Sequence, residues 1–101
     1  MKRIYIAGSI TKNPDYKKQF CNAEKILLSK GYVVFNPAKN KANSYKEYID
    51  IGLRQLQQCD AIYLLSNYKE SNGALLEFKY AKTVGIEIIK EERTSKCSFT
   101  C

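Results

Sequence analysis

One carboxylate occupies a place from which a folded chain normally excludes charge. Glu77 lies in a largely apolar stretch, residues 71–81, whose spacing predicts a helix. On that helix it shares a face with small or apolar residues, namely Gly73, Ala74, Tyr80, Ala81 and Val84. A charged group on such a face loses hydration, which is unfavourable unless a ligand or partner compensates for it. Glu77 is therefore a candidate catalytic residue; the alternatives are pairing with a buried lysine or solvation at the edge of the helix.

Two further segments suit the binding of a phosphate. Residues 71–73 begin the same predicted helix, where free backbone amides and the helix dipole attract anions. Residues 8–11 follow the first apolar segment and supply a glycine for close approach and two hydroxyls. A glycine and a serine after a strand also form ordinary turns, so this second signal is weak by itself. The candidate substrate-binding residues in these segments are Gly8, Ser9, Ile10, Ser71, Asn72 and Gly73.

Two tyrosines are candidates to contact an aromatic base. Tyr68 lies in the loop before Ser71, and Tyr5 lies in the first apolar segment. Aromatic side chains stack on nucleobases without a hydrogen-bond code, so either ring suits a base-binding pocket. A partly dehydrated carboxylate beside a bound sugar can attack the anomeric carbon and form a covalent glycosyl intermediate. Together these residues indicate chemistry at a sugar that carries a phosphate and a base.

The elements that must position these residues alternate along the chain. Residues 4–7, 32–35, 60–65 and 86–89 predict strands, and helical spacing predicts helices at 16–30, 45–56 and 71–83. This alternation predicts an α/β fold, a small flavodoxin-like or Rossmann-like parallel sheet of strand order 2-1-3-4 with helices on both faces. In such a sheet the loops after the first and third strands meet where ligands bind. Those loops carry Gly8 and Ser71.

Composition restricts the class of protein. The 101 residues suit one domain, which we place at 1–90, followed by a polar carboxyl-terminal tail at 91–101. No apolar run is long enough to cross a membrane, and the apolar stretch at the amino terminus is too short for a signal peptide. The chain has no histidine and no C-x-x-C pair, so we expect no metal site. We expect a cytoplasmic protein whose thiols are reduced.

The net charge of +7 favours anionic partners. No run of five basic residues and no nucleic-acid-binding motif is present, so we expect a small anionic ligand and rank a basic nucleic-acid-binding protein last among the alternatives. Lysines spread over solvated helix faces would give the same charge balance.

The same residues, taken in order, resemble the nucleoside 2-deoxyribosyltransferase superfamily. The closest likeness is to its small, mostly uncharacterised phage and bacterial branch, and it extends to about Ile89. The matching motifs are Tyr5-Ile6-Ala7-Gly8-Ser9-Ile10-Thr11, Gly31-Tyr32-Val33-Val34 with Asn36-Pro37-Ala38, residues 56–62, and Ser71-Asn72-Gly73-Ala74 with Glu77, Ala81 and Gly85. Ser71, six residues before Glu77, is similar to the serine of the deoxynucleoside 5′-monophosphate N-hydrolases; transferases acting on free nucleosides tend to carry aspartate there.

The resemblance implies an enzyme, an N-glycosidase that cleaves the base from a (deoxy)nucleoside 5′-monophosphate, with Glu77 as nucleophile and no metal or organic cofactor. It also implies a homodimer or larger assembly, for which the helix carrying Tyr45 and Tyr48 is the candidate contact. Two alternatives stay open. One is a nucleoside deoxyribosyltransferase, and the other is a catalytically weak protein of the same fold that binds a nucleotide or an ADP-ribose-type ligand.

One position departs from the resemblance. The superfamily usually has an aspartate eight residues before the Asp60 position, and this chain has Gly52 there. Gly52 lies on the inward stripe of its helix, so we expect space for a ligand, a close helix contact or a lost catalytic function. Asp50 cannot replace the aspartate, because two residues turn a helix by about 200°. Asp60 begins a strand, and we expect it to be structural.

Overall fold

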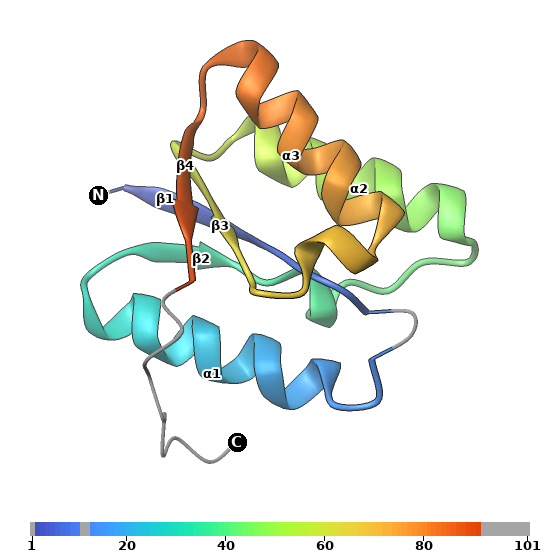
Figure 1. Ribbon diagram of the computed structural model, residues 1–101, viewed down its shortest axis with the longest axis horizontal. Coiled ribbons are helices and arrows are strands. Elements are labelled where there is room, and N and C mark those ends of the chain that lie inside the picture. Colours follow the sequence, from blue (N-terminus) through green and yellow to red (C-terminus); the bar gives the residue numbers. More distant parts are fainter. Residues whose placement is uncertain (1, 11–12, 92–101) are drawn as a thin grey trace.

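The computed structural model describes residues 2–10 and 13–91 and forms three layers (Figure 1). The central layer is a parallel sheet of order β2-β1-β3-β4. Its strands are β1 (Arg3–Ala7), β2 (Val33–Phe35), β3 (Ala61–Leu64) and β4 (Glu87–Lys90). Helix α1 (Tyr16–Ser29) covers one face, and α2 (Tyr45–Gln57) and α3 (Asn72–Val84) cover the other. The predicted fold class, strand order and placement of helices on both faces are confirmed.

Strand β1 holds the centre of the sheet. It pairs with β2 on one side and β3 on the other, so that Ile4 lies opposite both Val34 and Ala61. Residues 4–7 are all buried, because helices cover both faces of a parallel sheet, and this explains their continuous apolar run. The Oδ2 atom of Asp60 accepts the backbone N–H of Arg3 at 2.9 Å. This bond ties the start of β1 to the start of β3, which is the structural role expected of Asp60.

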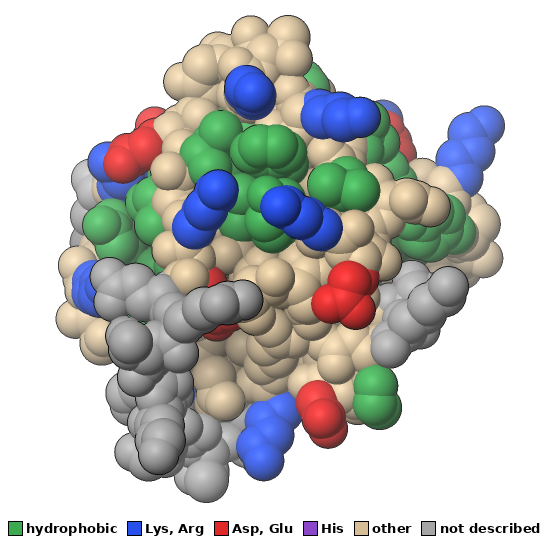
Figure 2. Space-filling model, viewed as in Figure 1, with side chains coloured by type: hydrophobic (Ala, Val, Ile, Leu, Met, Phe, Trp, Pro, Cys, Tyr) green, Lys and Arg blue, Asp and Glu red, His purple; other side chains and the backbone are tan. Residues whose placement is uncertain are grey.

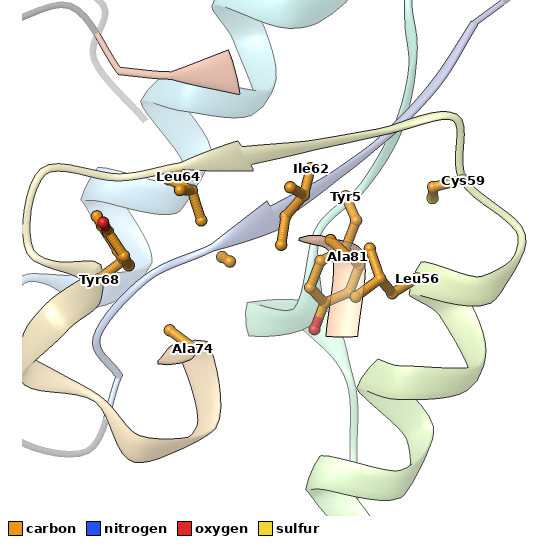
Figure 3. Close-up of a cluster of buried hydrophobic side chains, with 9 residues drawn as sticks. Tyr5, Leu56, Cys59, Ile62, Leu64, Tyr68, Ala74 and Ala81 are labelled. Atoms are coloured by element: carbon orange, nitrogen blue, oxygen red, sulfur yellow. The ribbon is translucent and has the colours of Figure 1, made fainter. Parts of the chain in front are cut away.

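Successive side chains of β1 point to opposite faces and enter two separate cores. Against α1, the buried residues are Ile4, Ile6, Phe20, Ala23, Leu27, Ala61, Tyr63 and Leu65. Beneath α2 and α3 they are Tyr5, Ala7, Leu56, Cys59, Ile62, Leu64, Tyr68, Ala74 and Ala81 (Figure 3). The alternation therefore sends Tyr5 towards the two helices that carry the candidate site.

The three helices begin and end within one residue of the predicted ranges, and a side chain or a glycine determines several of these ends. Ser44 and Ser71 cap α2 and α3, each accepting the backbone N–H three residues later. Gly31 and Gly85 follow α1 and α3 with φ of +87°, a conformation in which other residues are strained. These ends set where the loops beside the candidate site begin.

Two short 3₁₀ turns replace predicted loop: η1 (Pro37–Lys39) and η2 (Tyr68–Glu70). The β3–β4 ladder also extends one residue into the predicted tail, since the N–H of Glu91 donates to the carbonyl of Leu64 at 2.8 Å. The remainder of that tail, residues 92–101, lies outside the described residues.

Of the cysteines in the described part of the chain, Cys59 is buried and free. None of the helices in the described part of the chain has the length and apolar character that a membrane crossing requires.

Candidate active site

Glu77 lies in a small cavity between the carboxyl end of β1, helix α2 and the start of α3. The cavity is lined by Tyr5, Gly8, Ile10, Pro37, Tyr45, Tyr48, Ile49, Ser71, Gly73, Ala74 and Glu77. Its volume of about 20 Å³ holds roughly one water molecule. Six residues that the sequence singled out, five of them for substrate binding, therefore surround one space: Glu77 with Tyr5, Gly8, Ile10, Ser71 and Gly73.

The Glu77 side chain is buried with only 6% of its surface exposed. Helix α3 places it among Gly73, Ala74 and Ala81, which are also buried, as the helical spacing predicted. Val84 was expected on the same face but is 53% exposed, because α3 ends at that residue. Among the described residues no salt bridge includes Glu77, so neither alternative, a buried lysine partner or a solvated helix edge, describes this carboxylate.

One hydrogen bond holds the carboxylate. The Tyr5 hydroxyl, itself buried, donates to Oε2 of Glu77 at 2.6 Å. Burial raises the pKa of Glu77 to about 7, and the bond from Tyr5 lowers it only in part. Burial and the neighbouring carboxylate raise the pKa of Tyr5 well above its usual value. Glu77 thus changes charge near neutral pH while Tyr5 keeps its proton.

Gly52 explains how this pair fits beneath α2. A Cβ atom at Gly52 would lie 2.6 Å from the Tyr5 hydroxyl and 2.7 Å from Oε2 of Glu77. Both distances are below any normal contact, so the bare backbone of α2 lies directly against the pair. The predicted inward position of Gly52 is confirmed, and the reason is a close helix contact with the Tyr5–Glu77 pair.

Tyr68 is not brought to the cavity. Its ring lies in the core with 8% exposure, 5.5 Å from the centroid of Phe78. Figure 3 shows Tyr68 at one end of the apolar cluster, away from Tyr5. The η2 turn directs this side chain under α3, and such a turn was not predicted for the loop. Tyr5, the other candidate for base contact, does line the cavity.

Ser9 and Asn72 also lie outside the cavity lining. Ser9 is buried and its N–H donates to Oδ1 of Asn67 at 3.3 Å, so that amide is engaged within the protein. Asn72 is exposed on the first turn of α3. Ser71 does line the cavity, and its hydroxyl oxygen accepts from the amide of Ala74 at 3.2 Å.

A network of amide side chains joins the two loops. The Oε1 atom of Gln19, on α1, accepts from Nδ2 of Asn13 at 2.7 Å and from Nδ2 of Asn67 at 3.1 Å. Asn13 also donates to the carbonyl of Ser9. The loop after β1 and the loop after β3 are therefore tied through one acceptor on α1.

The cavity also contains residues that were not predicted as site residues: Pro37, Tyr45, Tyr48, Ile49 and Ala74. Tyr45, Tyr48 and Ile49 form a helical stripe on α2, the helix expected to make the subunit contact. Helical spacing places them on one stripe, but it does not distinguish packing against another element from lining a cavity.

Of the described residues that line this cavity, none is a lysine or an arginine. On the face drawn in Figure 2, basic side chains stand apart from one another around an apolar area. Within the described part of the chain, no group of three or more histidine, cysteine or acidic side chains is placed to hold a metal.

The raised pKa of Glu77 predicts an unusual pH dependence of stability. The folded state binds a proton that the unfolded state releases between about pH 4.5 and 7, so unfolding free energy falls as pH rises through that range. Relative to Glu77→Gln, the wild type should lose about 3 kcal/mol between these limits. Urea unfolding at both pH values measures this difference. The exposed control Glu70→Gln keeps Glu77 and should therefore lose as much stability with pH as the wild type does. Equal pH responses of wild type and Glu77→Gln would contradict the burial of a titrating carboxylate.

The close contact at Gly52 predicts that an added methyl group is harmful. Alanine favours a helix by about 1 kcal/mol over glycine, yet overpacking costs about 1–3 kcal/mol, so Gly52→Ala should lower the unfolding free energy. The cost should shrink by about 1 kcal/mol or more in a Tyr5→Phe background, where the hydroxyl is gone. A double-mutant cycle in urea tests this. Equal costs in both backgrounds would show that the methyl group does not meet the hydroxyl.

Two solved structures share this fold. A 2-desoxiribosyltransferase from Leishmania mexicana is 25% identical with a TM-score of 0.71, over 89% of this chain and 63% of that chain. This chain thus spans less than two thirds of that protein. A 2-deoxyribosyltransferase from the psychrotolerant bacterium Bacillus psychrosaccharolyticus is 19% identical with a TM-score of 0.70, over 96% of this chain and 77% of that chain. The resemblance to the nucleoside 2-deoxyribosyltransferase fold is confirmed.

No curated protein sequence matches the chain. A family model does match it, over residues 2–90, and that range includes every residue that lines the cavity. By this match the chain belongs to the family described as Domain of unknown function (DUF4406).

Proposed function

We propose that this protein cleaves the N-glycosidic bond of a (deoxy)nucleoside 5′-monophosphate, with Glu77 as the nucleophile. The observation that carries the proposal is a buried carboxylate, held by one hydroxyl, that lines a cavity together with both ligand-binding loops of the sheet. The likeness to two solved 2-deoxyribosyltransferases supports a reaction at the bond between base and sugar.

The geometry suits nucleophilic attack by a carboxylate. Tyr5 holds Oε2, which orients the group and leaves attack on the anomeric carbon to Oε1. Burial removes hydration from the carboxylate, and a poorly hydrated anion is a better nucleophile. The reaction then requires the ionised form, so activity should rise with pH as Glu77 loses its proton near pH 7.

The start of α3 suits the phosphate. Ser71 caps the helix and lines the cavity, and the first-turn amides and helix dipole favour an anion there. Six residues separate Ser71 from Glu77, which is about 9 Å along a helix. The Glu77 side chain leans back towards that end, so a sugar can lie between the phosphate and the carboxylate.

A nucleotide needs a wider cavity than the 20 Å³ present. The wall with the most freedom is the first turn of α2, where Tyr45 is 57% exposed. Tyr48 is held more firmly, because its hydroxyl donates to the carbonyl of Pro37 at 3.0 Å. Substrate entry therefore involves an outward movement of Tyr45 and the start of α2.

The assembly and location of the protein remain predictions. A second, open groove runs along α2 and is formed by Ser44, Lys46, Glu47, Ile49, Asp50 and Leu53. This groove suits the expected homodimer contact, and we expect the protein in the cytoplasm.

Purified protein incubated with each common ribo- and deoxyribonucleoside 5′-monophosphate should release free base, detected by chromatography. Glu77→Ala should reduce the rate by roughly 10³-fold or more, since the nucleophile is lost. Mass spectrometry of the quenched wild-type reaction should show the mass of a sugar phosphate added to the protein at Glu77. The exposed-site variant Glu70→Gln should retain the wild-type rate. Absence of base release from every nucleotide, or equal rates for wild type and Glu77→Ala, would contradict the proposal.

Ser71→Asp separates phosphate binding from helix capping. Aspartate caps helices as well as serine does, so thermal stability should be unchanged. Its negative charge should repel the phosphate and raise KM for a nucleotide about 10-fold or more, while KM for the matching nucleoside should not rise. Steady-state kinetics with both substrates check this. Equal increases in the two KM values would remove Ser71 from phosphate recognition.

A second function is favoured by Gly52 and the narrow cavity. With no side chain at Gly52 and space for one water, the same site suits a catalytically weak protein that holds a nucleotide or an ADP-ribose-type ligand. Such a protein would be stabilised against heat by a nucleotide that stays intact. A nucleoside deoxyribosyltransferase is the third alternative, and transfer of the sugar to an added free base would identify it.

A further inference from the structure

Among the residues that the structure describes, the cavity is lined by one carboxylate and by no second group suited to donate a proton near neutral pH. Its titratable lining residues, within the described part of the chain, are Glu77, Tyr5, Tyr45 and Tyr48. The part of α2 that lies against Glu77 is the backbone of Gly52, where even a Cβ atom would approach within 2.7 Å of Oε2. At Gly52, α2 therefore has no side chain that could give a proton to the leaving base.

The tyrosine hydroxyls are poorly suited to act as acids. Tyr5 donates its proton to Glu77, and Tyr48 donates its proton to Pro37. Burial and the nearby Glu77 charge raise the pKa of both hydroxyls above the usual range. An efficient general acid has a pKa near the working pH, and these groups do not. Tyr45, the most exposed of the lining tyrosines, lies at the mouth against Gly73.

This arrangement limits which bases can leave. When the C1′–N bond breaks, the base takes the electron pair, and Oε1 of Glu77 forms the new bond to C1′. A neutral base would depart as an anion unless it received a proton. A base that already carries a positive charge departs as a neutral molecule. Water then cleaves the glycosyl ester, regenerates the carboxylate and releases one proton to solvent.

We infer, resting on the proposed function, that the preferred substrates are nucleoside 5′-monophosphates whose base already carries a positive charge, such as N7-alkylated purine nucleotides. The charge of the cavity agrees with this class. Among the described lining residues, Glu77 is the one acidic side chain, and no lysine or arginine is present to repel a cation. A cationic base therefore needs no proton from these residues and meets no like charge among them.

The test compares N7-methyladenosine 5′-monophosphate with adenosine 5′-monophosphate, in ribo and deoxyribo forms, in single-turnover reactions at pH 7.5. Spontaneous loss of base is subtracted with the Glu77→Ala variant. General acid catalysis contributes roughly 10²–10⁴-fold, so without an acid the methylated nucleotide should react at least about 100-fold faster. Its rate should also rise through pH 7 and stay level to pH 8.5, because no acid is lost on the alkaline side.

Base release from both nucleotides at rates within a few-fold of each other would overturn the inference and leave the proposed function standing. A fall in the rate of base release between pH 7 and 8.5 would also overturn the inference, because it would indicate a general acid that loses its proton in this range. Release from neither nucleotide, in either sugar form, would also overturn the inference; the proposed function falls with it only if the full set of common nucleotides releases no base either.

Discussion

The site depends on a single hydrogen bond, the 2.6 Å contact from the Tyr5 hydroxyl to Glu77. A buried carboxylate without a donor would be strongly unfavourable. Tyr5 comes from the central strand and Glu77 from a helix on one face, so the bond links two layers of the fold. Gly52 completes the arrangement, because only a residue without a side chain lets α2 lie against both partners. Tyr5, Glu77 and Gly52 therefore connect the central strand, the packing of α2 and the environment of the carboxylate.

This coupling explains why the chain keeps a glycine inside a helix despite its unfavourable propensity. The lost helix stability, about 1 kcal/mol relative to alanine, is comparable to the cost of a methyl group forced into the same space. A larger residue would separate α2 from the pair and open the site to water. Hydrated, the carboxylate would return towards its ordinary pKa.

Much of the fold could be read from the sequence because its signals are local. The apolar runs of β1 and β3, the serine caps at Ser44 and Ser71, and Gly31 and Gly85 each determine a boundary through nearby atoms. The site was predicted less completely, since it depends on contacts between distant segments. Tyr68 precedes a 3₁₀ turn that directs its ring into the core, and no local pattern signals this. Likewise, helical spacing showed that Tyr48 faces inward without showing that a cavity lies there.

The shared acceptor on Gln19 has a consequence for how this pocket diversifies. Because Asn13 and Asn67 donate to the same oxygen, neither loop can shift alone without losing a hydrogen bond to Gln19. Homologues that accept differently shaped molecules should therefore have changed both loops together. Ligand selectivity in these homologues would then change by paired substitutions in the loop after β1 and the loop after β3. Variants substituted in only one of the two loops would be disfavoured.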